Sequence, residues 1–307
     1  MIHKDLKING LRWVHILRPQ KEDIEFIKSI FSFHNLVSES VQKPTFHSLI
    51  EDFGDHLFLV LHLPVIHKGW KKNDIIETDF LITKETIITI NYENFKNLDE
   101  IFENFSKDED IQNKVSKQHS GILLYHIIDK LFSRTLSDLD IVEKELDRIE
   151  AGIFKKNEKR VEVVENISNI RMDILDFWRT FRPQQVVLKS LPEKIGKIHE
   201  KSVEPYFFDL LNTEERIRNI VENQKETIES LHQTNESLMA SNTNQIISVL
   251  TVFSTIILPL NFIASIWGMN HVFLPLRDGV YDFWIIIFGM GAIAGIMLAV
   301  FRKIRWF

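Results

Sequence analysis

Two long runs without a charged residue, close together near the C-terminus, constrain this chain more than any other feature. Between Glu236 and Arg277 there is no Asp, Glu, Lys or Arg, and residues 246–266 of that window are mainly apolar. A second charge-free run covers residues 283–301. A helix of about 20 apolar residues crosses a hydrocarbon core of about 30 Å. We therefore expect two transmembrane helices joined by a short loop, and two such runs fit a buried hairpin of a soluble protein less well.

Basic residues set the expected orientation in the membrane. Arg302, Lys303 and Arg305 lie in the last six positions, whereas the connection between the two runs holds Arg277 against two acids. Cytoplasmic segments are enriched in Lys and Arg. The N-terminus shows no basic region followed by an apolar core, so no secretory signal is expected. We expect a multi-pass protein of the cell (inner) membrane with both termini in the cytoplasm.

Composition excludes several classes of function. The absence of cysteine excludes disulfides and thiolate metal sites. With 37 Lys and Arg against 43 Asp and Glu, and the bases scattered, nucleic acid is not the expected partner. The sequence contains no Gly-rich phosphate loop, no His-Glu-x-x-His and no Gly-x-Ser-x-Gly, so we expect neither an enzyme nor an organic cofactor.

Periodicity divides the chain into segments. Short strand-like and helix-like patterns alternate over residues 1–118, which predicts an α/β cytosolic domain. Helical periodicity over residues 119–203 predicts an antiparallel helical pair, with an end near Gly152 and a break or kink at Pro183. The segments that follow are a stalk helix at 204–245, a first transmembrane helix at 246–267, an outward-facing loop at 268–282, a second transmembrane helix at 283–301 and a basic tail at 302–307.

The stalk helix is unusually long. No Gly or Pro lies between Pro205 and Pro259, so one rod is expected to run from the cytosolic part into the membrane. Its first half carries apolar residues at near-heptad spacing. This stripe consists of Leu210, Ile217, Val221, Ile228, Leu231 and Leu238. Because a single rod cannot bury such a stripe, we expect the chain to oligomerise.

Polar residues recur every three or four positions along one side of the first transmembrane helix. The candidate set is Asn244, Ile247, Leu250, Thr251, Ser254, Leu258 and Asn261. Polar groups in lipid face a partner helix or a water-filled path, so interhelical hydrogen bonding and a pore lining both stay open. In a pore the two Asn would give rings of neutral oxygens and the aliphatic residues narrow rings that gate by dewetting. The set contains no carboxylate, which would hold a divalent ion too tightly for conduction.

The segment Ile266-Trp267-Gly268-Met269-Asn270 ends this helix. Pro259 lies eleven residues before the Asn, the following loop contains Pro275, and a second apolar helix and a basic, aromatic C-terminus come next. Together these features resemble the signature of the CorA family of magnesium transporters. The segment at 205–210 is similar to the start of the family's stalk helix.

The resemblance implies an α+β multi-domain membrane protein that forms a funnel-shaped homopentamer, whose inner helices line a pore. It also implies that Gly268, Met269 and Asn270 form the entrance for Mg²⁺. Because Mg²⁺ gives up water reluctantly, a ring of Asn270 carboxamides would bind the hydrated ion, and Gly268 would permit a backbone turn. Uptake would then be passive and driven by the membrane potential.

Asp209 matches an acid that, in the family, helps to bind regulatory Mg²⁺ between neighbouring cytosolic domains, so that internal Mg²⁺ favours the closed state. The family's second acid, three residues later, is Asn212 here, and an ordinary surface Asp at a helix start is the alternative. The loop also departs from the family, because Val272 and Leu276 stand where acids are common, and His271 directly follows the motif. His271 would suit Co²⁺, Ni²⁺ or Zn²⁺.

Two other functions remain open. One is a zinc or transition-metal transporter of the ZntB kind, with or without proton coupling, although the intact Met269 favours a magnesium channel. The other is a membrane-anchored sensor or scaffold whose helical rod transmits signals without ion flux.

Overall fold

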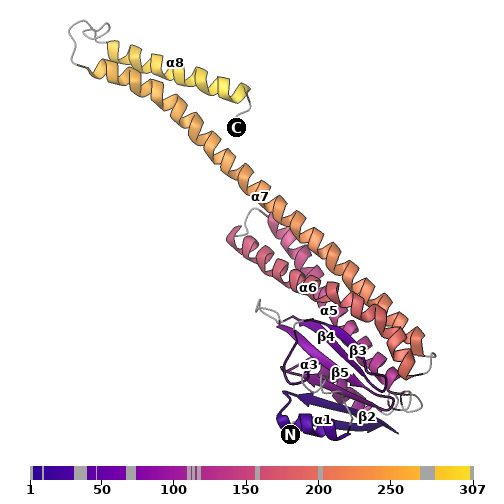
Figure 1. Cartoon of the computed structure of the whole chain (residues 1–307). Coiled ribbons are helices and arrows are strands. Elements are labelled where there is room, and N and C mark those ends of the chain that lie inside the picture. Colours follow the sequence, from indigo (N-terminus) through magenta and orange to yellow (C-terminus); the bar gives the residue numbers. More distant parts are fainter. Residues whose placement is uncertain are drawn as a thin grey trace. The chain divides into compact units, whose positions relative to one another are not determined.

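The computed structural model describes residues 3–8, 10–30, 40–45, 47–66, 74–108, 112, 115, 119–155, 160–199, 203–269 and 281–304. The chain divides into two compact units, Met1–Leu231 and His232–Phe307. The helices are α1 (Lys21–Ile30), α3 (Lys96–Lys107), α5 (Ser120–Phe154), α6 (Arg160–Ile198), α7 (Glu204–Gly268) and α8 (Asp282–Lys303), all seen in Figure 1.

A six-stranded sheet forms the centre of the first unit. Its strands are β1 (His3–Ile8), β2 (Leu11–Leu17), β3 (Leu49–Asp52), β4 (Leu57–Val65), β5 (Asp74–Ile82) and β6 (Thr86–Asn91). Their order in the sheet is β1-β2-β6-β5-β4-β3. The pair of β2 and β6 is parallel, whereas the other neighbours are antiparallel. The long apolar runs of β4 and β6 are buried almost throughout because both faces of the sheet are covered.

Helices pack on both faces of the sheet. The side chains of β2 alternate between the faces, as in any strand. Val14 belongs to an apolar cluster with Ile24 and Ile27 of α1. Trp13 points the other way and packs on Phe102 of α3, with ring centroids 4.8 Å apart. The unit therefore has an apolar core on each side of the sheet, and the predicted α/β fold of this region is confirmed.

The two long helices α5 and α6 carry the first part of α7. Tyr125 donates to Asp209, and Gln224 donates to the carbonyl of Leu139, so α7 runs parallel to α5. Trp178 of α6 donates to Glu222, whereas Arg171 pairs with Glu229, so α6 is antiparallel to α7. Up to Asn235, the buried residues of α7 alternate at spacings of three and four, the heptad pattern. They are Phe207, Leu210, Glu214, Ile217, Val221, Gln224, Ile228, Leu231 and Asn235.

This packing corrects one step of the sequence interpretation. We expected the stripe on the stalk helix to need a second subunit for its burial. Ile217 and Ile228 are instead fully buried within the chain. The reason is that α5 and α6 supply the apolar partner surface themselves, for example through Phe177 and Leu139. The stripe therefore gives no argument for oligomerisation.

Of the break or kink expected at Pro183, the break is not observed. α6 continues through Pro183 and Pro192 to Ile198. A proline inside a helix removes one backbone hydrogen bond, and tertiary packing compensates here. Leu188 and Leu191, which follow Pro183, are buried at 2% and 1% exposure.

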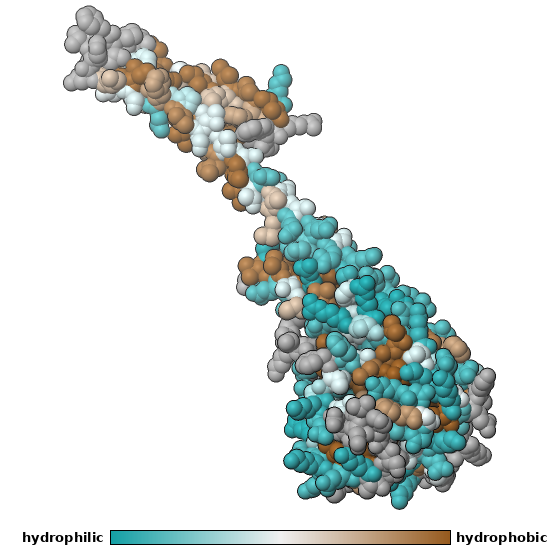
Figure 2. All heavy atoms as spheres, viewed as in Figure 1, coloured by the Kyte–Doolittle hydropathy of each residue, from teal (hydrophilic) through white to brown (hydrophobic). Residues whose placement is uncertain are grey.

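The second unit contains two helical stretches that are long and apolar enough to cross a membrane. One is the C-terminal part of α7 and the other is α8. Figure 2 shows hydrophobic residues along both, in contrast with the mainly hydrophilic surface of the first unit. Large apolar side chains such as Phe253 (62% exposed) and Phe288 (73% exposed) point outward, which fits a surrounding of lipid.

Candidate functional site

A stripe of covered residues runs along one side of α7 in the second unit. Val252 is 5% exposed, and Ile256, Pro259, Ile263 and Ile266 are half-buried. The matching stripe on α8 consists of Ile286, Met290, Ala294, Met297 and Phe301. Spacings of three and four on both helices are the pattern that two packed helices produce. One side of α7 is therefore occupied by α8.

The candidate lining residues lie on the opposite side of α7. At about 100° per residue, Ser254 and Leu258 are each roughly 160° around the helix from Ile256. Leu258 is 70% exposed, and Asn244, Ser254 and Asn261 are exposed as well. The structure thus brings these polar residues onto a single face that α8 leaves open.

Chemically, this open face offers neutral oxygens and apolar surface. Between Asn244 and Asn261 no side chain carries a formal charge. Thr251, half-buried at the edge of the set, donates its hydroxyl to the carbonyl of Ile247 at 2.8 Å. Its oxygen lone pairs stay available as acceptors. Such a surface can hydrogen-bond the water shell of a cation without ligating the ion directly.

The tripeptide Gly268-Met269-Asn270 lies at the end of α7. The helix ends at Gly268, and the N–H of Met269 still bonds to the carbonyl of Ile266 at 3.2 Å. Met269 is 61% exposed. Asn270 and His271 lie outside the described residues. The expected need for glycine at 268 is not seen, because its φ is not left-handed and a Cβ there would meet no atom within 4 Å.

Asp209 lies in the first turns of α7, in contact with α5. Its carboxylate accepts a hydrogen bond from Tyr125 at 3.0 Å, and the ring of Tyr206 packs on that of Tyr125. Partial burial, this hydrogen bond and the carboxylate of Asp129 raise the pKa of Tyr125 to about 12. Asp209 itself is exposed, as is Asn212. Within the part of the chain that the structure describes, no three acids or histidines gather as metal ligands.

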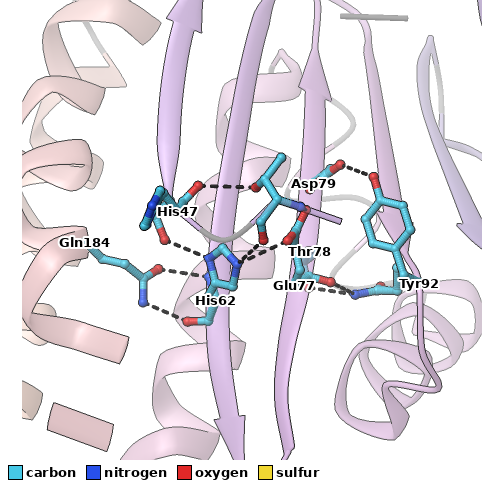
Figure 3. Close-up of polar contacts among 10 residues, drawn as sticks. His47, His62, Glu77, Thr78, Asp79, Tyr92 and Gln184 are labelled. Carbon is cyan, nitrogen blue, oxygen red and sulfur yellow. Dashed lines mark hydrogen bonds and ion pairs between the residues drawn. The ribbon is translucent and has the colours of Figure 1, made fainter. Parts of the chain in front are cut away.

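A buried polar network in the sheet was missed at the sequence level (Figure 3). His62 of β4 faces Glu77 of β5 across the strand pair, with Nε2 and Oε2 3.1 Å apart. Gln184 of α6 bonds to both the N–H and the carbonyl of His62. The side-chain amide thus pairs with β4 beyond the end of β3, as a strand would. The signal in the sequence was a strand pattern whose buried part contains two acids, at 77 and 79.

The same network holds a second buried carboxyl, that of Asp79. Burial, reinforced by the charge of Glu77, raises the pKa of Asp79 well above its usual range. Asp79 is fully buried, and Tyr92 donates to its Oδ2 at 2.8 Å. Figure 3 shows these side chains pointing at one another between strands. We interpret the network as a structural joint between sheet and α6, because its polar atoms are directed at one another.

Taken together, the two units define a membrane protein with a large polar α/β part and two membrane-spanning helices. Comparisons with known proteins support this. The model of the family described as "CorA-like Mg2+ transporter protein" matches residues 9–303. The "Cobalt/magnesium transport protein CorA" of Thermotoga maritima is 26% identical over 295 residues, which cover 96% of this chain and 83% of that protein.

The solved structures agree at the level of the fold. The complete structure of the CorA magnesium transporter from Methanocaldococcus jannaschii superposes with a TM-score of 0.82 at 22% identity, covering 97% of this chain and 92% of that one. The cytoplasmic domain of ZntB from Vibrio parahaemolyticus is more distant, with a TM-score of 0.58, 14% identity, and coverage of 77% and 90%. The chain belongs to the CorA family of divalent cation transporters, whose members are ion transporters or channels and not enzymes.

Proposed function

We propose that this chain forms a passive channel for hydrated Mg²⁺, with the face of α7 that carries Asn244, Ser254 and Asn261 as the pore lining. The observation that supports this most directly is the position of these polar residues opposite the stripe covered by α8. An uncharged polar face in a membrane helix requires polar partners, and a water-filled axis supplies them.

The ion would enter at Gly268, Met269 and Asn270 and pass inward along α7. Neutral amides and hydroxyls bind a water shell weakly enough for release. Leu258, Leu250 and Ile247 would form the narrow apolar rings. No ATP is needed, because a membrane potential of about 100 mV contributes about 4.6 kcal/mol to the entry of a divalent ion. Co²⁺ and Ni²⁺, similar in hydration, are the expected secondary substrates.

The pore requires several copies around one axis, and we propose a homopentamer in the inner membrane with both termini in the cytoplasm. One α7 alone presents only one wall. The basic end of α8, with Arg302 and Lys303 in its last turn, supports a cytoplasmic C-terminus.

We further propose that Asp209 takes part in feedback by cytosolic Mg²⁺. Its carboxylate is exposed, and its Oδ2 accepts a hydrogen bond from the hydroxyl of Tyr125. Since the described part of one chain offers no set of three ligands, the ion would bridge Asp209 to a neighbouring subunit. An ion held between subunits favours the state in which they lie close together.

Reconstitution into vesicles with an internal Mg²⁺-sensitive dye tests the channel. We expect a potential-driven influx that Asn270→Ala abolishes and that Ser254→Phe lowers by about tenfold, because a bulky side chain would fill the pore. The matched control is Val249→Phe, five residues earlier and roughly 140° around the helix. Equal effects of the two Phe variants would show that the pore lies on another face.

The same vesicles separate the remaining alternatives. A ZntB-like zinc transporter would carry Zn²⁺ in response to a pH gradient and would carry little Mg²⁺. A sensor or scaffold would pass neither ion, and wild-type vesicles would then match Asn270→Ala. For the feedback site, Asp209→Asn should weaken the inhibition by internal Mg²⁺, and unchanged inhibition would remove Asp209 from the mechanism.

A further inference from the structure

The free end of the α5–α6 hairpin exposes large apolar side chains next to basic ones. We call this set the hairpin tip; it consists of Phe154, Lys155, Arg160, Val161 and Val164. Phe154 is 65% exposed, Val161 68% and Val164 42%. Hydrophobic residues are visible at this end of the hairpin in Figure 2. Grouped apolar exposure of this kind marks an interaction surface.

The tip is exposed although the hairpin next to it is well packed. Ile153 and Val163, the neighbours of Phe154 and Val164, are 1% and 4% exposed. Arg160 donates to the carbonyl of Ile153 at 3.4 Å, which closes the end of α5. The outward position of the apolar tip residues is therefore a property of folded, paired helices and not of a frayed end.

Charge is sorted along the hairpin. Residues 136–150 carry six acids and two bases, whereas residues 153–164 carry four bases and two acids. Residues 136–150, which we call the shaft of the hairpin, are thus acidic, whereas the hairpin tip is basic and apolar. Apolar side chains beside Lys and Arg are the combination that binds the interface of an anionic bilayer.

The tip lies at the end of the first unit from which α7 continues. α5 and α7 are parallel, as the pairs Tyr125 with Asp209 and Leu139 with Gln224 show. Both helices therefore point their C-terminal ends in the same direction. The membrane run begins at residue 246, only 15 residues after the unit ends at Leu231, about 22 Å of helix. The chain's own membrane run thus follows this end of the first unit after a connection of 15 residues.

From these observations we infer that the hairpin tip binds the anionic lipid headgroups of the bilayer that holds the chain. Phe154, Val161 and Val164 insert among the headgroups, and Lys155 and Arg160 contact the lipid phosphates. The tip then anchors the α5–α6 hairpin to the membrane surface. The inference does not depend on which ion is transported or whether one is.

The absence of native cysteine allows a direct test on the full-length protein. Val161→Cys carries a bimane label in nanodiscs that contain about 30 mol% phosphatidylglycerol and a headgroup-nitroxide lipid as quencher. Ser137→Cys, exposed on the shaft of α5, is the matched control. We expect quenching at 161 to exceed that at 137 by about threefold, and to fall by about half when phosphatidylcholine replaces the anionic lipid.

A second variant tests the contribution of charge. Lys155→Glu, an exposed position, should reduce quenching at 161 in anionic nanodiscs and leave the thermal unfolding midpoint unchanged. Equal quenching at 161 and 137, or quenching at 161 that ignores both lipid charge and Lys155→Glu, would overturn the inference. So would a buried bimane spectrum at 161 in lipid-free detergent, because a second copy of the chain would then cover the tip.

Discussion

At the scale of single residues, Asp138 shows how burial changes the chemistry of an ordinary side chain. Asp138 of α5 is 7% exposed and has Arg134, one turn earlier, as its nearest base at 3.8 Å. Burial raises the pKa of Asp138 to about 6, and the charge of Arg134 only partly opposes this. The folded state therefore binds this proton more tightly than the unfolded chain, whose aspartate has a pKa of 3.8.

The sign of the resulting pH dependence follows from linkage. The bound proton stabilises the fold fully below pH 3.8, and this contribution is lost as the pH rises through about 6. Asp138→Asn, which cannot ionise, should stabilise the first unit at pH 7.5 by on the order of 1–2 kcal/mol, after discounting for solvent screening. Urea unfolding of the full-length protein in detergent, followed by tryptophan fluorescence, measures the difference.

The gain from Asp138→Asn should shrink towards pH 4.5, where wild-type Asp138 is already protonated. Asp140→Asn, two residues further on and exposed, is the control and should change stability little at any pH. His15 and His199, whose pKa values are lowered to about 4, give the wild type an opposite trend. Comparing variant with wild type at each pH removes their contribution. A gain that is the same at pH 4.5 and 7.5 would contradict the assignment.

At the scale of elements, the joint between the sheet and α6 depends on one amide. Gln184 is 1% exposed, bonds to the N–H of His62 at 3.1 Å and donates to its carbonyl at 2.7 Å. Gln184→Leu keeps the volume but leaves both backbone groups buried without these partners. We expect a loss of about 2–4 kcal/mol in unfolding free energy, from about 1–2 for each group.

The control for this change is Gln185→Leu, at the neighbouring half-buried position. Gln185→Leu should lower the unfolding free energy much less than Gln184→Leu. Hydrogen exchange adds a local measurement, because the amide of His62 loses its acceptor in Gln184→Leu and should exchange faster than the amides of β4 that pair with β5. Unchanged protection of His62 would show that another group replaces the glutamine.

At the buried heptad positions of α7 we expect the opposite effect, a gain in stability when a polar side chain is replaced. Gln224, 2% exposed, donates to the carbonyl of Leu139 and to Glu143, but no donor among the described residues reaches its Oε1. The carbonyl of Leu139 lies inside α5 and keeps its helical partner when the glutamine is removed. Gln224→Leu should therefore stabilise the unit by about 1 kcal/mol in urea unfolding. Asn223→Leu, at an exposed position, is the control. Equal gains in unfolding free energy from the two variants would mean that the higher helix propensity of leucine alone explains the effect.

These elements also show what the sequence could predict. Strand β4 and the apolar positions 210, 217 and 228 of α7 were predicted because their periodicity is set by burial of apolar groups. Glu214, Gln224 and Asn235 occupy the same heptad seam but were missed, because polar residues carry no burial signal of their own. Gln184 was missed for a second reason: its partner, His62, is 122 positions away.

The candidate site was predictable to a similar degree. The polar face of α7 follows from spacing alone, and the structure places it opposite the stripe covered by α8. The partner that covers Ile217 and Ile228 of α7 could not be predicted from the sequence, because either α5 and α6 or a second subunit could cover that face. Sequence periodicity shows that a surface must be covered but does not identify its partner.

At the scale of the whole molecule, the channel proposal requires that the polar faces of several α7 helices meet on one axis. A cysteine-free chain makes this measurable. Ser254→Cys, on the open face, should form disulfide-linked dimers under mild oxidation in membranes, seen on a non-reducing gel. Val252→Cys is the matched control, because Val252 is 5% exposed on the covered stripe and should remain monomeric.

The two cysteine variants together decide the arrangement. Adjacent copies in a closed ring present the same residue to one another near the axis, so cross-linking at 254 but not at 252 requires the polar face to point inward. Equal cross-linking at both positions would mean random collision. If a lysine-directed cross-linker yields a ladder of five bands while Ser254→Cys gives no dimer, the assembly exists but α7 presents another face to its axis. The pore would then have to run along another face of α7, such as that of Phe253 and Ile257, whose side chains offer a hydrated ion no hydrogen bond.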